Sequence, residues 1–591
     1  IGSAHYMYLF YKQDAGLNVP VFALALWLGF YVSEPGAGKS VGWWLLGILT
    51  TYSSVFVYIH GSDLALFSFI VSSLIWSAFT FNPRYSIVPS LLAAARSFIG
   101  APYFLLRDVY RDKSVIKQMS QHLKAGKVLT FLIPLLIAIV FFFIYKQANP
   151  LFNDLTKAIR LDFISVQWCF FLVLSFLVMN GYFRHQPLVF LNNWELSQPT
   201  KLSPNENEKP VHNEFRAFLL LLVLLNGMLL VINGLDLRYL YLGAGMPAGI
   251  THKEFVHDGV NNLIFSILLG IVVMLYYFRS SLNFHEQGKG LRWLATLWIL
   301  QNLFMVGSTA LRNHMYIDAA LLTYKRIGVY YWLFFAAAGL FLTYLKVKQL
   351  KPAWYLIVEG ARLALFVLVA SCSIDWDVFI TRYNIQHCNP LASLDKKYLL
   401  SLSCGSLPEL YAIKNKPGFL VDSAYSYSYY NGVKNSTVLD NKLYSQLWSP
   451  DSIDWQSNNV RRKKIAQDIE GLMNSGLLDS LDLSNCRLYY PERLNQLPGL
   501  RSLVLNRNVL YDSVLCEKLC RLPNLKTMAF EKIDNDDAKK LYRVKSMQTI
   551  VILKLGDRNA IYTAYDILKE KLRCADTSSA YLPKTMMPKM P

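Results

Sequence analysis

The sequence predicts a polytopic α-helical membrane protein with ten or eleven transmembrane helices, followed by a C-terminal soluble α/β domain of leucine-rich repeats. Three observations support this fold class. Hydrophobic residues make up 53% of the 591 residues and charged residues only 17%, which is unusual for a soluble protein. Long apolar segments recur up to residue 372. Two repeat motifs then follow within residues 478–510.

Ten segments approach the length of about 20 apolar residues that a helix needs to cross about 30 Å of hydrocarbon. We predict transmembrane helices at residues 17–32, 41–59, 64–81, 128–145, 165–183, 215–235, 259–278, 291–310, 328–345 and 354–372. Residues 87–106 are also apolar but contain Arg96, Pro89 and Pro102. That segment is therefore a crossing, a re-entrant segment or an interfacial helix.

Basic residues in short loops indicate the orientation, because such loops stay in the cytoplasm. Residues 107–127 contain six Lys or Arg against two Asp, and residues 346–351 contain three Lys and no acid. With both loops in the cytoplasm, alternate crossing places residues 311–327 and everything after Cys372 outside. The net charge of +19 is thus mainly a topology signal, and we predict no nucleic-acid binding.

The soluble part begins where hydropathy falls, after Cys372. We divide the chain into a transmembrane domain (1–372), an extracytoplasmic, mostly helical linker domain (373–468) and a leucine-rich-repeat domain (469–591). In the linker, short helices should flank a Tyr-rich stretch at 425–430, expected to be an exposed loop or edge, with carbohydrate stacking as an alternative.

Residues 478–488 and 500–510 each fill the template L-x-x-L-x-L-x-x-N/C-x-L, with Cys486 and Asn508 at the N/C position. Residues 525–530 and 547–552 keep the apolar spacing but lose the Asn or Cys. Four short strands should therefore form a small parallel sheet, with helices at 538–544 and 564–573. The alternative is an ordinary α/β domain with Leu-rich strands.

Side chains between the fixed apolar positions of each strand should face solvent on the concave side of the repeats. These partner-binding candidates are Asp482, Ser484, Val504, Asn506, Ala529 and Glu531. The set lacks the aromatic platforms of a glycan site and the basic stripe of a nucleic-acid site, so it favours a protein partner.

Polar groups near the membrane supply two further sets of candidates. One is a cluster in two loops on the same predicted side: His257, Asp258, Arg312, Tyr316, Asp318 and Arg326. The other is polar residues within predicted helices, where charges are costly: Asn226, Asn233, Gln301, Glu359 and Arg362. Glu359 and Arg362 are three residues apart and can pair with each other. The second set lines a pathway or holds helices together.

Three patterns are weaker. His252 and His257 lie at a spacing that separates them on a helix, so we expect a polar loop capping a helix that starts near Gly259, with a metal site as the alternative. Residues 33–40 end like a phosphate-binding loop but lack its first Gly and a preceding strand. We predict no metal and no cofactor. A disulfide between Cys388 and Cys404 is possible on the oxidising side.

Four stretches resemble a known family: residues 9–18 (LFYKQDAGLN), 255–259 (FVHDG), 312–326 (RNHMYIDAALLTYKR), and 381–385 (TRYNI) followed by 394–402 (LDKKYLLSL). They are similar to bacterial integral-membrane proteins known only as domain of unknown function 4173, with the related 4153 group. The resemblance covers about residues 8–465 and stops before the repeats. It departs from the family pattern at Leu321 and Asp258. It implies a bacterial inner-membrane protein of unassigned activity.

A chain that joins a membrane domain to leucine-rich repeats is more typical of a protein that recognises a partner than of an enzyme. We predict a non-enzymatic bacterial inner-membrane scaffold, assembly factor or sensor whose periplasmic repeats bind another envelope protein or membrane complex. One alternative is a transporter or channel that uses the polar helix residues. The other is a membrane enzyme acting on lipid or glycan through the cluster around His257 and Arg312.

Overall fold

The computed structural model describes residues 2–104, 107, 138, 141–142, 145, 148, 166–185, 188–204, 212–242, 252–278, 281–284, 288–414, 416, 419, 435–446, 454–474, 478–483, 494, 497, 499–505, 525, 527–530 and 549–552. The chain divides into two compact units. The first consists of Ile1–Ile374 and Trp455–Asn459, and the second of Asp375–Asp454 and Val460–Pro591.

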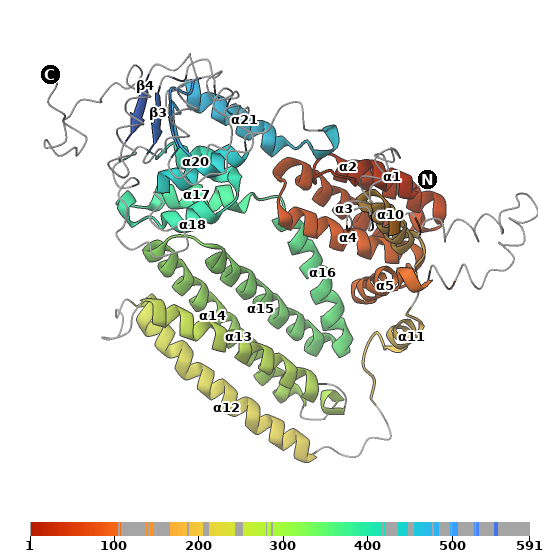
Figure 1. The fold of residues 1–591 in the computed structure, drawn as a ribbon. Helices are drawn as coiled ribbons and strands as arrows, with labels where there is room; N and C mark the ends of the chain where they lie inside the picture. Colours follow the sequence, from red (N-terminus) through yellow and green to blue (C-terminus); the bar gives the residue numbers. More distant parts are fainter. Residues whose placement is uncertain are drawn as a thin grey trace, which may run out of the picture. The chain divides into compact units, whose positions relative to one another are not determined.

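The described part of the first unit is helical (Figure 1). Its longer elements are α1 (Gly2–Phe10), α2 (Asn18–Ser33), α3 (Val41–His60), α4 (Asp63–Phe81), α5 (Ile87–Ile99), α10 (Val166–Phe183), α11 (Val189–Ser197), α12 (His212–Asp236), α13 (His252–Tyr277), α14 (Gly288–Ala320), α15 (Tyr324–Gln349) and α16 (Ala353–Ser371). Short helical turns are η1 (Ala37–Lys39), η2 (Leu237–Tyr241), η3 (Ser281–Phe284) and η7 (Trp455–Ser457).

Buried side chains in the described part of this unit form two clusters. One joins α1–α4, α10 and α16 around Phe30, Trp43 and Trp76. The other joins α12–α15 around Phe218, Trp298 and Leu340, and Figure 1 shows these four helices side by side. Aromatic rings dominate the first cluster, where Trp27 lies 4.9 Å from Trp43 and 4.7 Å from Trp76, centroid to centroid. Such contacts stabilise helix packing where lipid weakens the hydrophobic driving force.

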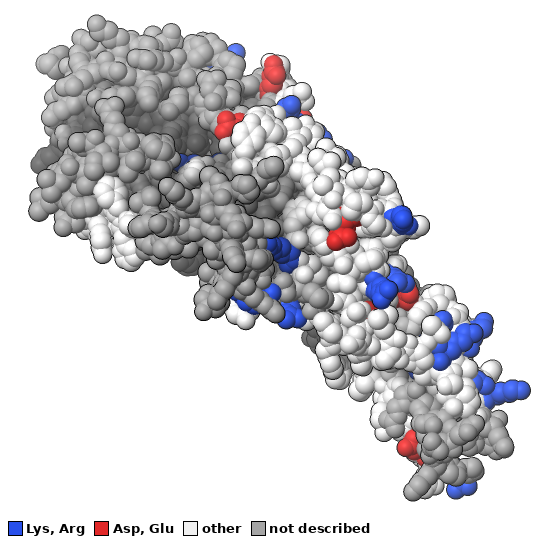
Figure 2. Space-filling view, turned by 90° about the vertical axis from the view of Figure 1, so that its right-hand side faces the viewer, with Lys and Arg blue, Asp and Glu red and all other residues white. Residues whose placement is uncertain are grey.

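Among the described residues, six helices are long and apolar enough to cross a membrane: Val41–His60, Asp63–Phe81, Asn213–Tyr241, Gly288–Ala320, Tyr324–Gln349 and Ala353–Ser371. Large apolar side chains such as Leu28, Leu230 and Trp293 are exposed on this unit. On the face in Figure 2, most of the described surface carries no charge. By length and composition the chain is a multi-pass helical membrane protein.

The other predicted crossings are shorter helices or lie outside the described residues. Shorter apolar helices occupy Asn18–Ser33, Ile87–Ile99, Gln167–Phe183 and Phe265–Tyr277. With 13 residues, α5 is only about 20 Å long, less than the hydrocarbon thickness. The predicted helix at 128–145 lies almost entirely outside the described residues. The total of ten or eleven crossings therefore stays a prediction.

Two predicted loops are wrong, because they are helical. Residues 252–258 form the first turns of α13 and do not precede a helix starting near Gly259. Residues 312–320 continue α14, and only residues 321–323 separate it from α15. Hydropathy marks where apolar side chains stop, whereas a helix continues until a residue breaks it. Leu321, with a left-handed φ of 62°, ends α14.

The family-like stretch 9–18 is folded around one buried amide. Asn18 donates to the carbonyl oxygens of Leu9 (3.0 Å) and Asp14 (2.9 Å) and accepts from the N–H of Gly16 (2.8 Å). The distant segment Trp455–Asn459 packs here, since the N–H of Leu17 donates to Asn458 O at 2.9 Å. A Cβ on Gly16 would come within 2.6 Å of this segment, so the approach requires glycine.

The second unit combines helices with a sheet. Its helical elements are α17 (Trp376–His387), η4 (Leu391–Ser393), α18 (Lys396–Ser401), η5 (Cys404–Ser406), α19 (Leu407–Tyr411), α20 (Asn435–Gln446) and α21 (Val460–Asn474). Cys388 and Cys404 are free thiols, so the possible disulfide is not formed. The Tyr-rich stretch 425–430 lies outside the described residues.

The sheet contains β1 (Ser480–Asp482), β2 (Ser502–Val504), β3 (Thr527–Phe530) and β4 (Thr549–Ile552). The strands are parallel, in the order β1-β2-β3-β4, and each lies within one predicted repeat unit. Ser480 pairs with Ser502, Ser502 with Thr527 and Thr527 with Thr549. Equivalent positions of successive predicted repeat units therefore lie next to each other in the sheet. Leu481 and Leu503 are buried on the same face. The helices predicted at 538–544 and 564–573 lie outside the described residues.

Candidate functional site

The sheet brings three of the predicted partner-binding residues into one row. Asp482 pairs with Val504, and Val504 with Ala529, across neighbouring strands. Asp482 and Val504 are half-buried, while Leu481 and Leu503, one residue earlier, are buried. Because side chains alternate along a strand, Asp482 and Val504 lie on the face opposite the leucines. Ser484, Asn506 and Glu531 lie outside the described residues.

A buried ionic cluster holds the start of this row against α20. Asp440 Oδ1 accepts from Tyr411 Oη and from Lys414 Nζ, each at 2.6 Å. The backbone N–H of Asp482 donates to Asp440 Oδ2 at 2.8 Å. Burial raises the pKa of Asp440 above its ordinary value, and these three donors oppose that rise. Burial and the adjacent carboxylate raise the pKa of Tyr411 well above 10.0, so its hydroxyl remains a donor.

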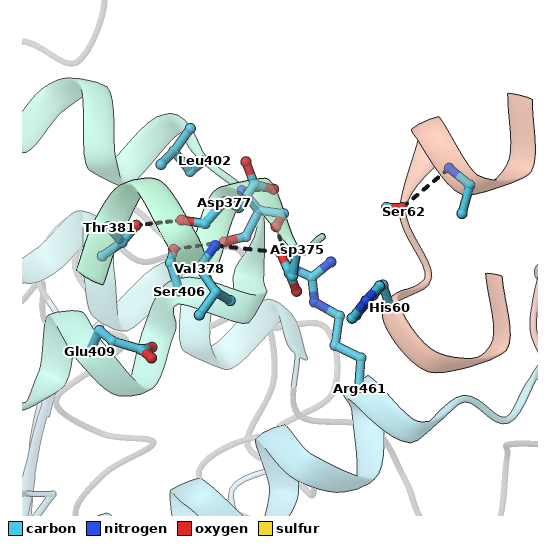
Figure 3. A network of polar contacts seen from close by, with 12 residues as sticks. His60, Ser62, Asp375, Asp377, Val378, Thr381, Leu402, Ser406, Glu409 and Arg461 are labelled. Atoms are coloured by element: carbon cyan, nitrogen blue, oxygen red, sulfur yellow. Dashed lines mark hydrogen bonds and ion pairs between the residues drawn. The ribbon is translucent and has the colours of Figure 1, made fainter. Parts of the chain in front are cut away.

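A second polar network joins α17 and α21 (Figure 3). Asp375 caps α17 by accepting from the N–H of Val378 at 3.4 Å and lies 3.7 Å from Arg461. Asp377 accepts from the N–H of Ser403 at 3.2 Å, and Arg461 donates to Ser403 Oγ. These contacts hold α17, the start of η5 and α21 together, so the charges of Asp375, Asp377 and Arg461 have structural roles.

Within the predicted cluster of the first unit, Arg326 and Tyr316 lie together. The Arg326 guanidinium lies over the Tyr316 ring, 4.3 Å from its centroid. Arg326 also donates to the carbonyl oxygens of Ala320 and Leu321, and its own carbonyl accepts from Asn313 at 3.1 Å. A cation at the C-terminal end of α14 interacts favourably with the helix dipole. Arg326 therefore organises the turn between α14 and α15.

Two other cluster residues, Arg312 and Asp318, have other partners. Arg312 pairs with Asp236 at the end of α12. Asp318 is exposed and lies 3.9 Å from His314, one helical turn earlier. His257 and Asp258 belong to α13, but their side chains lie outside the described residues. Whether all six side chains meet in one site stays a prediction.

Three of the predicted intramembrane polar residues join α12 to α14. Gln301 donates to Asn226 Oδ1 at 2.8 Å, and Asn226 donates to the carbonyls of Leu222 (2.8 Å) and Leu294 (3.2 Å). Asn233 donates to Gln301 O at 3.0 Å. Together with the Arg312–Asp236 pair, these bonds run along one helix interface. The contacts are those of residues that hold helices together.

The remaining pair, Glu359 and Arg362 on α16, lines a groove of about 780 Å³ that the sequence did not indicate. Arg362 donates to Glu359 at 2.6 Å. The walls come from α3, α4, α5, α11, α16 and the turns beside them, including Arg84, Glu195 and Lys351. Glu195 accepts from Trp354 Nε1 at 3.1 Å and from the N–H of Ser86 at 3.3 Å. No local pattern joins these positions, because they are far apart in the sequence.

In the part of the chain that the structure describes, no group of three or more His, Cys, Asp or Glu could hold a metal ion. Residues 33–40 connect two helices, α2 and α3, through η1. This context differs from the strand and helix that flank a phosphate-binding loop.

Comparison with known proteins gives one relationship. No curated protein and no solved structure matches the chain. A family model described as Domain of unknown function (DUF4153) matches residues 21–413, more than half of the chain. The matched region runs from α2 to the residues just after α19 and ends before the sheet. The chain therefore belongs to the DUF4153 family.

Proposed function

We propose that this chain is a bacterial inner-membrane scaffold, assembly factor or sensor that binds another envelope protein through C-terminal leucine-rich repeats. The observation that carries the proposal is the row Asp482, Val504 and Ala529 on a parallel sheet whose strands recur once per unit. Stacked repeats of this kind present an extended binding surface. The row mixes acidic and small apolar residues, which fits a protein partner better than a glycan or nucleic acid.

The family match supports separate roles for the membrane helices and the sheet. It covers the membrane helices and ends at residue 413, so the sheet lies outside the matched region. We propose that the membrane body anchors the chain and the repeats give it a partner. Three lysines lie in the last turn of α15 or between α15 and α16: Lys346, Lys348 and Lys351. They favour a cytoplasmic position for the C-terminal end of α15 and a periplasmic position for the second unit.

Affinity purification in a mild detergent tests the proposal. A triple variant, Asp482→Lys with Asn506→Lys and Glu531→Lys, should lose a partner that co-purifies stoichiometrically with the unaltered chain. A control triple variant on exposed helix positions, Lys463→Glu with Lys464→Glu and Glu470→Lys, should retain it. Retention by the strand-face variant, or by a chain ending near Asp468, would assign recognition to the membrane body instead.

A further inference from the structure

The groove beside α16 changes from polar to apolar along its length. One end of the groove, called the mouth here, lies where α4 ends and where α3 and α16 begin, at Ser40, Arg84 and Lys351. Further along the same helices the walls become Leu49, Ile75 and Leu365. From Pro352 to Leu365 the groove follows α16 for about 20 Å. Its volume of about 780 Å³ is in the range of sites for small organic ligands.

The lining of the groove contains three cations, Arg84, Lys351 and Arg362, against two carboxylates, Glu195 and Glu359, so its net charge favours an anion. Glu359 is neutralised by Arg362, and Glu195 is held by Trp354 and the N–H of Ser86. Arg84 is exposed and forms no ion pair with any described residue. Lys351 Nζ lies 5.8 Å from the Tyr355 ring centroid and likewise has no carboxylate partner among the described residues. Two cations are therefore available where α3 and α16 begin.

Buried hydroxyl groups next to the mouth also lack partners. Ser90 is fully buried and lines the groove, and its Oγ has no hydrogen bond to any described residue. The Oγ of Ser86, one helical turn earlier on the same wall, also has no hydrogen bond to any described residue. Because an unsatisfied buried hydroxyl costs free energy, these two groups indicate a ligand with hydrogen-bonding oxygens.

We propose that this groove binds one anionic membrane phospholipid, with its phosphate near Arg84 and Lys351 and one acyl chain along Leu49 and Leu365. A phosphate diester satisfies the two cations and the serine hydroxyls, and an acyl chain covers the apolar walls. Trp194 and Trp354, 4.8 Å apart between ring centroids, stand beside the mouth. Tryptophans gather at the level of lipid headgroups, and basic pockets between membrane helices bind anionic lipids.

Native mass spectrometry of the delipidated full-length chain tests this site. The probes are phosphatidylglycerol, phosphatidylcholine with the same acyl chains, and inorganic phosphate. One phosphatidylglycerol should be retained preferentially over phosphatidylcholine. Arg84→Gln with Lys351→Gln should weaken its binding about tenfold or more, since each lost charged hydrogen bond is worth about 1.5–3 kcal/mol. Leu49→Trp, which fills the apolar wall, should weaken it with the cations intact.

Two control variants make the result decisive. Lys289→Gln, on an exposed lysine at the start of α14, should leave binding unchanged. Arg84→Lys retains the charge and should retain most of the binding, which separates lost recognition from misfolding. Equal binding of both lipids, competition by inorganic phosphate, or indifference to both the double variant and Leu49→Trp would overturn the proposal.

Discussion

The carboxylate of Asp440 on α20 accepts a hydrogen bond from the backbone N–H of Asp482 on β1, at 2.8 Å. The same carboxylate also accepts from Tyr411, within the family-matched region, and from Lys414, one residue after it, so one buried cluster connects the end of that region with the first strand of the sheet. The edge of the proposed binding surface is thus fixed by groups that the sequence motif does not contain.

Asp440→Asn should destabilise the second unit by about 3–5 kcal/mol, because it leaves Lys414 as an uncompensated buried charge. Hydrogen exchange at the amides of Leu481 and Asp482 in the full-length chain measures the effect. Arg382→Gln is the matched control, since it breaks the more exposed Arg382–Glu409 pair and should cost about 0–1 kcal/mol. Equal exchange rates in the two variants would show that the buried pair contributes nothing particular.

The raised pKa of Asp440 predicts a pH dependence with a definite sign. In the window from the ordinary value of 3.8 up to the folded-state pKa, the folded chain binds more protons than the unfolded chain. Stability contributed by the protonated form is present below this window and is lost as pH rises through it. The difference in unfolding free energy between the unaltered chain and Asp440→Asn should change across the window. A difference independent of pH there would contradict the assignment.

Reporter fusions test the orientation that the lysines after α15 predict. Alkaline phosphatase fused after Asp468 should be active, because that enzyme folds only outside the cytoplasm. A fusion after Lys351 should be inactive and should instead support a cytoplasmic reporter. Cytoplasmic-reporter activity after Asp468 would place the proposed binding surface on the wrong side for an envelope partner.

The predicted cluster at the ends of α13 and α14 is tested by crosslinking. In a cysteine-depleted chain, His257→Cys with Asp318→Cys should form a disulfide upon mild oxidation, because the first turns of α13 and the last turns of α14 lie at the same end of a helical hairpin. The pair His257→Cys with Lys289→Cys, at opposite ends of that hairpin, should not. Absence of crosslinking at 257–318 and at neighbouring positions would separate the two motifs.

Local patterns predicted the elements better than their ends or their contacts. Apolar runs predicted the helices, and the spacing around Leu481 and Leu503 predicted the strands, because both signals come from side chains of one segment. The ends of α13 and α14 were missed because polar residues such as His257 and Arg312 can continue a helix. The groove was missed because Arg84, Glu195 and Lys351 come together only through packing, which no single segment encodes.

Site-specific photocrosslinking tests the strand-face proposal most directly. A photoreactive phenylalanine analogue at position 504 replaces a half-buried valine in the proposed binding row, and at position 503 it replaces the buried Leu503 on the opposite face of β2. The account predicts that position 504 crosslinks the same envelope protein that the Asp482, Asn506 and Glu531 triple variant loses, and that position 503 does not. Crosslinks from neither position, or from both alike, would contradict it.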